Sequence, residues 1–172
     1  MLNTIPIPLK SLRIRMNKIA RFILTLALLQ TVSALAAPPV DWGFVNIKEG
    51  FKRAHDENKP IFILFGFENC PWCKVLYRNA LSDSELRDFY RKEFVLVYMS
   101  TLGEKEDPVY RLPGGLELSA KEITKTWKVY PVPSWRWLRP DGTLIAADSN
   151  ARTTVREFRF KGEDALRAMA TR

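Results

Sequence analysis

The amino-acid sequence predicts an α/β domain with a central mixed β-sheet and helices on both of its faces. Residues 60–67 and 94–100 are continuous apolar runs, each long enough for one fully buried strand. Residues 131–147 contain two strand-like segments around a tight Pro-Asp-Gly turn, which is the pattern of a β-hairpin. A βαβ half followed by a hairpin implies a sheet with both parallel and antiparallel strands.

Helical segments are predicted around these strands. Residues 44–60 carry apolar side chains at three- and four-residue spacings and end at a Lys-Pro pair. Residues 73–81 continue from a pair of cysteines and are expected to be helical, as are residues 161–172 at the end of the chain. Residues 101–118 lack a clear period and are rich in proline and glycine, so they are expected to form a loop or small excursion.

Two more helices are predicted from capping boxes, in which a serine and a glutamate three residues later bond to each other's backbone N–H groups. Ser82 with Glu85 indicates a helix over about 83–92. Ser119 with Glu122 repeats the signal and indicates a short helix after the irregular segment.

The first 36 residues have the pattern of a secretory signal peptide. A basic end is followed by the apolar run FILTLALLQTVSALA and by small residues at Ala34 and Ala36. We therefore expect cleavage after Ala36, export to the periplasm or the exterior, and a mature domain over residues 37–172.

Two alternatives concern this leader. The stretch from Met16 would be a complete signal peptide alone, so a start at Met1 or at Met16 stays open. Residues 22–40 contain no charged side chain and approach the ~20 residues that span a bilayer, so a retained membrane anchor is the second alternative.

The composition, 172 residues with 47% apolar and 12% aromatic side chains, fits one folded domain. Most of the net charge of +8 comes from leader cations, namely Lys10, Arg13, Arg15, Lys18 and Arg21. In the rest of the chain basic and acidic residues are interspersed, as on solvated helix faces. No nucleic-acid partner is therefore expected.

Both cysteines of the chain, Cys70 and Cys73, lie in the stretch FENCPWCKVL. A disulfide persists in an exported protein, but a bridge across two intervening residues removes little entropy from the unfolded chain. Cys70 is predicted at a helix N-terminus, where the helix dipole favours a thiolate, and Pro71 fits the first turn. We expect Cys70 to be exposed and to attack, and Cys73, farther inside, to resolve the mixed disulfide.

Other uses of this pair have to be weighed. A zinc site needs about four ligands, and the chain offers two cysteines and His55, which is expected to be a solvated surface residue. No metal site is predicted. A copper carrier needs fewer ligands than a zinc site and favours thiolates, so this interpretation stays open. A purely structural disulfide also stays open beside redox chemistry.

Three stretches together resemble the thioredoxin superfamily: IFILFGF, CPWCK and, later in the chain, KVYPVPSW. The resemblance covers roughly residues 44–170 and implies the thioredoxin fold, in which Cys-x-x-Cys at a helix N-terminus faces a cis-proline. Within this superfamily the chain is most similar to secreted bacterial thioredoxins, including those linked to sulfur oxidation and to periplasmic disulfide reduction.

The resemblance assigns roles residue by residue. It implies that Cys70 is the nucleophile, Cys73 the resolving cysteine and Pro133 the cis-proline. Val132, just before that proline, would present its backbone to a substrate chain like a short added strand. Trp72, between the cysteines, is a further candidate for substrate contact or for packing on the helix.

The chain also departs from ordinary thioredoxins. They carry a buried aspartate six residues before the first cysteine, where this chain has Leu64, and a tryptophan directly before it, where this chain has Asn69. Glu68 is a candidate for the missing proton transfer, with an exposed loop acid as the simpler interpretation.

The hairpin sequence raises one further question. Trp135 and Trp137 alternate along the first predicted strand and are expected in the core. Arg136 lies between them, and an acidic partner or an edge position would explain a charge there.

These observations predict an exported thiol–disulfide oxidoreductase that reduces protein disulfides. An oxidase or isomerase, and a non-enzymatic thioredoxin-like copper carrier, are the alternatives. No bound cofactor is expected, because the electrons reside in the two thiols. The predicted partners are protein disulfides and a membrane electron carrier, and the protein is expected to be a monomer.

Overall fold

The computed structural model describes residues 38–102 and 109–171, which belong to one compact unit. The predicted leader over residues 1–36, its start and its cleavage site lie outside the described residues, as does most of the alternative anchor over 22–40. None of the helices in the described part combines the length and apolar character needed to cross a membrane.

The predicted mixed sheet is confirmed. It has four strands in the order β2-β1-β5-β6. Strand β1 (Ile61–Gly66) pairs in parallel with β2 (Val95–Ser100) and antiparallel with β5 (Ser134–Leu138), and β5 pairs antiparallel with β6 (Leu144–Asp148). All six residues of β1 are buried, as expected for a strand with neighbours on both sides.

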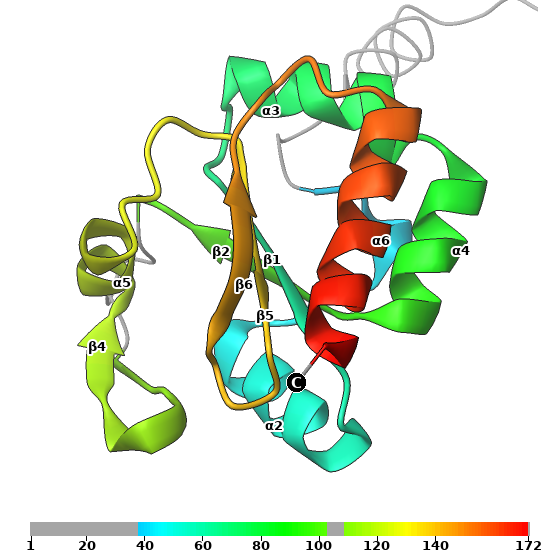
Figure 1. Ribbon diagram of the computed structural model, residues 1–172. Coiled ribbons are helices and arrows are strands. Elements are labelled where there is room, and N and C mark those ends of the chain that lie inside the picture. The colour runs from blue at the N-terminus through cyan, green and yellow to red at the C-terminus, as the bar shows by residue number, and fades with distance from the viewer. Residues whose placement is uncertain (1–37, 103–108, 172) are drawn as a thin grey trace, which may run out of the picture. The chain divides into compact units, whose positions relative to one another are not determined.

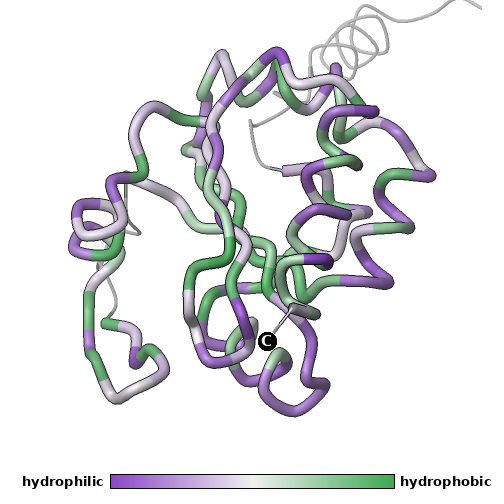
Figure 2. Tube along the Cα trace, in the orientation of Figure 1, coloured by the Kyte–Doolittle hydropathy of each residue, from purple (hydrophilic) through white to green (hydrophobic). Residues whose placement is uncertain are grey.

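Helices cover both faces of this sheet. One face packs against α2 (Ile47–Glu57) and α5 (Ala120–Thr126). The other packs against α3 (Pro71–Leu76), α4 (Ser84–Glu93) and α6 (Val155–Ala170). Figure 1 shows α4 and α6 side by side on one side of the sheet and α5 on the other. Hydrophobic residues concentrate along the central strands (Figure 2), so the core consists of two layers around the sheet.

The expected excursion after β2 contains a small second sheet. Strand β3 (Val109–Arg111) pairs antiparallel with β4 (Glu117–Ser119), and the 3₁₀ turn η3 (Pro113–Gly115) joins them. Gly114 and Gly115 both have φ above +80°, which a side chain rarely tolerates. Another 3₁₀ turn, η1 (Val40–Trp42), precedes α2.

The prediction that Ser82 and Glu85 cap α4 is wrong. Asp83 is the N-cap, and its carboxylate accepts the Leu86 N–H at 2.7 Å. The Ser82 hydroxyl instead donates to the Arg78 carbonyl at 3.0 Å. Serine and aspartate are both favourable N-cap residues, so Ser82 and Asp83 were both candidates. The Asp83 carboxylate has the additional advantage that its negative charge interacts favourably with the positive end of the helix dipole.

The capping box of Ser119 and Glu122 is confirmed at the start of α5. A second one, Thr154 with Glu157, opens α6. This helix therefore begins at Val155, earlier than the start at residue 161 that the sequence indicated.

The predicted helix over residues 73–81 changes geometry along its length. The α-helical part α3 ends at Leu76, and a π-helical turn, η2 (Tyr77–Leu81), continues it. Such wider turns recur near functional sites because they re-aim side chains. Here the turn begins with Tyr77, one turn beyond Cys73.

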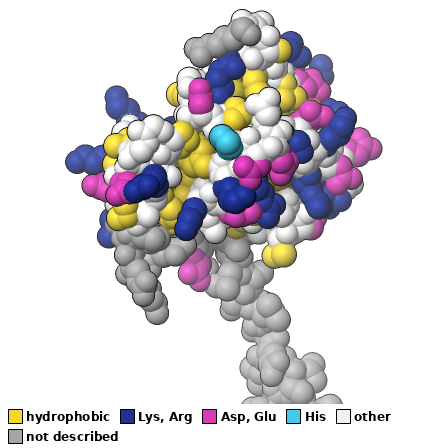
Figure 3. Space-filling view, turned by 90° about the horizontal axis from the view of Figure 1, so that it is seen from below, with side chains coloured by type: hydrophobic (Ala, Val, Ile, Leu, Met, Phe, Trp, Pro, Cys, Tyr) yellow, Lys and Arg dark blue, Asp and Glu magenta, His cyan; other side chains and the backbone are white. Residues whose placement is uncertain are grey.

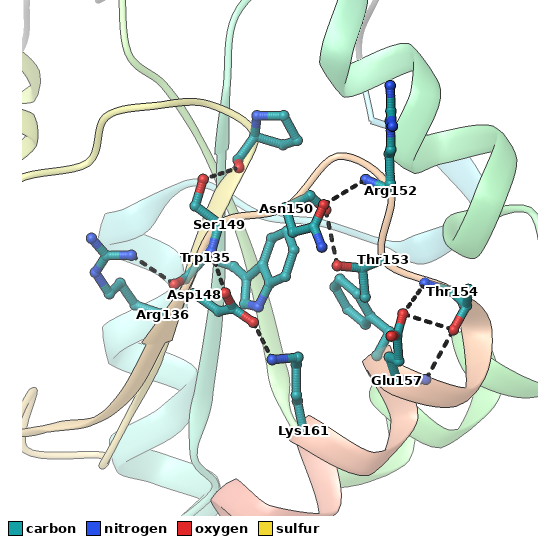
Figure 4. A network of polar contacts seen from close by, with 12 residues as sticks. Trp135, Arg136, Asp148, Ser149, Asn150, Arg152, Thr153, Thr154, Glu157 and Lys161 are labelled. Carbon is teal, nitrogen blue, oxygen red and sulfur yellow. Dashed lines mark hydrogen bonds and ion pairs between the residues drawn. The ribbon is translucent and has the colours of Figure 1, made fainter.

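Trp135 and Trp137 are buried in the core, as predicted. The edge position suggested for Arg136 is wrong, whereas an acidic side chain, Asp148, does act on it and partly offsets the effect of burial on its pKa. Arg136 is 8% exposed on a central strand, and its guanidinium donates to the Trp127 and Lys128 carbonyls at 3.0 and 3.3 Å. A third bond, to the Trp135 carbonyl, is drawn in Figure 4. Burial lowers the pKa of Arg136, and bonds to carbonyls at the end of α5 compensate the buried charge.

The surface fits the charge pattern of the sequence. Figure 3 shows basic and acidic side chains interspersed over one face. Several pairs are i,i+4 contacts along one helix, such as Lys52 with Asp56 at 2.6 Å and Arg53 with Glu49 at 2.7 Å. Exposed pairs of this kind contribute little to stability.

Candidate redox site

The two cysteines lie at the start of α3, shortly after the end of β1, and form a disulfide with a Cα–Cα distance of 5.3 Å. Asn69 has φ of 62°, a left-handed conformation that asparagine tolerates, and it turns the chain into the helix. Cys70 is the N-cap of α3, and its Sγ accepts the Cys73 N–H at 3.1 Å. Pro71 is the first helical residue, as predicted.

The expected exposure of Cys70 is wrong. Cys70 is 1% exposed and Cys73 0%, so both are buried. Because Cys70 Sγ accepts the Cys73 N–H and is bonded to Cys73 Sγ, it is turned toward the first helical turn and not outward. Trp72, between the two cysteines, is 54% exposed.

A proline-rich loop emerges beside this disulfide. Ser134, the first residue of β5, pairs with Phe65 near the C-terminal end of β1. The loop before β5 and the cysteine turn after β1 therefore lie at the same end of these two strands. The Tyr130–Pro131 and Val132–Pro133 peptide bonds in this loop are cis. Pro133 is buried and Val132 is half-buried.

Ser149, just beyond β6, fixes this loop and carries no signal in the sequence that would have revealed its role. Its hydroxyl lies 3.0 Å from the Pro131 carbonyl and 2.9 Å from the Pro133 carbonyl, and it donates to these oxygens. Figure 4 shows Ser149 with one of these prolines. Asp148 accepts the Ser149 N–H at 2.7 Å and forms an ion pair with Lys161 of α6. The loop is therefore tied to the far edge of the sheet and, through it, to α6.

Two tyrosine hydroxyls, of Tyr77 and Tyr98, lie among the apolar side chains on the α3 side of the sheet. Leu64 is fully buried, and Tyr98 of β2 is its register partner. Burial raises the pKa of Tyr98, and the charge of Glu68 raises it further. Burial also raises the pKa of Tyr77, and so does its interaction with Tyr98. Both phenols therefore stay protonated at neutral pH.

A family model described as a thioredoxin-like domain matches residues 47–150, which include the cysteine turn and the proline loop. The chain belongs to this thioredoxin-like family. The predicted fold is thereby confirmed, and the matched region includes the Cys70–Cys73 disulfide at the start of α3.

Solved structures agree with this fold. The thioredoxin-like chain is similar to a structure titled DsbH Oxidoreductase, with a TM-score of 0.56, 18% identity, and coverage of 72% of this chain and 83% of that one. It is also similar to a disulphide isomerase from Xylella fastidiosa Temecula1, with a TM-score of 0.53, 16% identity, and coverage of 70% and 88%. At these identities the likeness concerns the fold.

Among characterised sequences, the thioredoxin-like chain is 36% identical over 59 residues to Spermatogenesis-associated protein 20 of Homo sapiens. The match covers 34% of this chain and 7% of that protein. The chain therefore spans only a small part of the length of this relative.

The remaining predicted residues lie at the periphery of the thioredoxin-like site or away from it. Glu68 is exposed in the cysteine turn. His55 lies exposed on α2, with its Nδ1 3.4 Å from Asp56, as expected for a solvated residue. In the part of the chain that the structure describes, no three His, Cys, Asp or Glu side chains are grouped so that they could hold a metal ion.

Proposed function

We propose that the protein is exported and reduces protein disulfides through a mixed disulfide on Cys70 that Cys73 resolves. The observation that carries this proposal is the disulfide at the start of α3 in a thioredoxin-like domain. In the reduced state the Cys73 N–H and the positive end of the helix face the Cys70 sulfur, and both favour a thiolate.

The proposed reaction has two exchanges. The Cys70 thiolate attacks one sulfur of the substrate disulfide, a Cys70–substrate bond forms, and the other substrate sulfur leaves and is protonated. Cys73 then loses its proton and attacks Cys70 Sγ, which releases the second substrate sulfur as a thiol. Two electrons pass to the substrate, and the enzyme ends with the Cys70–Cys73 disulfide seen in the structure.

Substrate recognition is proposed at the proline loop. Val132 lies two residues before Ser134, which pairs with Phe65 of β1, so its backbone extends β5 toward the cysteine turn. An extended substrate segment can add to such a backbone like a strand. Two exposed aromatic residues supply apolar contact area: Trp72, between the cysteines, is 54% exposed, and Tyr130, two residues before Val132, is 63% exposed.

The proposed setting follows from the leader and from the resemblance to secreted bacterial thioredoxins. We propose that a membrane electron carrier returns the enzyme to its dithiol state, that no bound cofactor takes part, and that the protein acts as a monomer without nucleic acid. The direction of electron flow depends on how strongly the domain stabilises the thiolate.

A trapping experiment tests this function. A Cys73→Ser variant, expressed with its full leader in a Gram-negative host, should accumulate covalent complexes with exported proteins that dithiothreitol dissolves. A Cys70→Ser variant is the matched control and should trap nothing. If neither variant traps a protein and the wild type does not reduce insulin, the proposed function is wrong.

The same preparations distinguish the alternatives. An oxidase or isomerase would restore activity to a reduced or scrambled substrate faster than it reduces insulin. A copper carrier would bind Cu(I) tightly through the reduced pair and would lack reductase activity. Periplasmic product that begins at residue 37 would support export with cleavage, whereas a cytoplasmic full-length chain would contradict it.

A further inference from the structure

Leu64 leaves the resolving cysteine without the carboxylate that the resemblance implied beneath it. Its side chain is fully buried, and its register partner across the parallel pair is Tyr98. Leu64 and Tyr98 pack with the same core layer, on the α3 side of the sheet. A phenol therefore stands beside the place where an acid was expected.

A glycine brings this phenol and the resolving sulfur to one space. A Cβ at Gly66 would lie 3.1 Å from Cys73 Sγ and 3.2 Å from Tyr98 Oη. Sulfur and hydroxyl thus border the same gap, which exists because Gly66 has no side chain. Two groups this close to one point can be bridged by a single water.

Three side chains act on Tyr98 from neighbouring segments. Tyr77, from the turn after α3, has a buried hydroxyl that makes no hydrogen bond among the described residues but lies close enough to Tyr98 for the two phenols to shift each other's pKa. Phe44 contacts the Tyr98 ring edge-on at a centroid distance of 6.5 Å. Glu68, exposed in the cysteine turn, is close enough to raise the pKa of Tyr98 through its charge. Tyr98 therefore brings a protonated hydroxyl next to the resolving sulfur.

We propose that Tyr98 is the proton-transfer residue for Cys73. The inference rests on the proposed function. During resolution the Tyr98 hydroxyl accepts the Cys73 proton while its own proton passes to water. The thiolate then attacks Cys70 Sγ, the Cys70–substrate bond breaks, and the substrate sulfur takes a proton from solvent.

The first test measures the Cys73 thiol alone. In a Cys70→Ser background, [3-¹³C]cysteine labelling gives one NMR signal whose shift follows ionisation of Cys73. Adding Tyr98→Phe should raise the apparent pKa of this thiol, so that about tenfold less thiolate is present at neutral pH. Gly66→Ala keeps the hydroxyl but places a methyl group in the gap, and it should shift the titration in the same direction.

Tyr90→Phe is the matched control. It also removes a buried phenol hydroxyl, but one that lies between α4 and α6 and donates to the Phe158 carbonyl at 2.8 Å. It should leave the Cys73 titration unchanged. Titration curves for Tyr98→Phe and Gly66→Ala that coincide with the parent curve would overturn the inference.

The second test separates the two cysteines by kinetics. Reduced enzyme releases one thionitrobenzoate when Cys70 attacks Ellman's reagent and a second when Cys73 resolves the adduct. Tyr98→Phe should slow the second phase about tenfold at neutral pH, leave the first unchanged, and converge with wild type at high pH. Equal second phases would contradict the role of Tyr98, whereas a wild type that resolves its adduct but reduces no protein would refute only the proposed function.

Discussion

At the scale of single residues, Ser149 shows how a side chain remote in sequence shapes the site. A hydroxyl has one proton, so its two contacts with the Pro131 and Pro133 carbonyls share a single donor. The shared bond holds both carbonyls of the loop at once, and it does so from the residue that follows the edge strand β6.

Ser149→Ala should therefore loosen the loop without touching the thiols. Loss of one hydrogen bond costs about 1 kcal/mol of unfolding free energy, and we expect that loss in urea denaturation. The KM for insulin reduction should rise severalfold while kcat stays near the wild-type value. Ser82→Ala, which removes an exposed hydroxyl on the far side of α3, is the control; an unchanged KM in Ser149→Ala would show that the loop does not bind substrate.

At the scale of elements, Gly162 sets the distance between α6 and α4. A Cβ at this position would lie 2.8 Å from Tyr90 Oη, 3.0 Å from its Cζ and 3.1 Å from Cε1 of Phe89. The Tyr90 ring is fully buried and bonded to the Phe158 carbonyl, so it has little room to move.

Gly162→Ala should destabilise the domain, although alanine is the better helix former by about 1 kcal/mol. Overpacking of this kind typically costs about 1–3 kcal/mol, so we expect a net loss in thermal or urea unfolding. Ala168→Gly, at an exposed position of the same helix, should cost about 1 kcal/mol through propensity alone. A Gly162→Ala variant more stable than wild type would mean that the two helices can separate freely.

The start of α6 also has a pH dependence of its own. The backbone and side-chain hydrogen bonds from Thr154 lower the pKa of Glu157 below its ordinary value of 4.5. The folded state thus binds this proton less tightly than the unfolded chain, so the stabilisation is present above pH 4.5 and is lost as the pH falls through the lower folded value.

Glu157→Gln should remove this component, because the amide can still cap the helix but does not titrate. Urea unfolding at a series of pH values from neutral to below 4.5 should show a shallower decline for the variant than for wild type. Thr154→Ala should also flatten the curve and should lower stability at neutral pH by about 1 kcal/mol. Parallel curves for all three proteins would contradict the capping role.

At the scale of the whole molecule, most of the architecture could be predicted because its signals are local. The two apolar runs became β1 and β2, and the Pro-Asp-Gly turn became the β5–β6 hairpin. The cysteine turn and the start of α3 were predictable for the same reason, since helix capping and proline placement depend on neighbouring residues.

The parts that could not be predicted depend on contacts between distant segments. Arg136 looked anomalous because its partners, carbonyls at the end of α5, have no mark in the sequence. Tyr98 lies beside Leu64 because β1 and β2 pair, and Ser149 contacts the proline loop because β6 lies next to β5. Neither contact has a local signal in the sequence. The late start predicted for α6 has a local cause. Residues 157–160 alternate polar and apolar side chains as a strand would, and the capping box of Thr154 overrides that pattern.

The position of β1 in the sheet has a consequence for how the domain opens. This strand has a partner on each side and helices over each face, so its amides should be among the last to exchange with solvent. The cysteine turn follows β1 directly. The proline loop, by contrast, is held on the β6 side by the single proton of the Ser149 hydroxyl, which the Pro131 and Pro133 carbonyls share. Local opening can therefore admit a substrate at the loop while the sulfur atoms stay anchored to the slowest-exchanging segment of the chain.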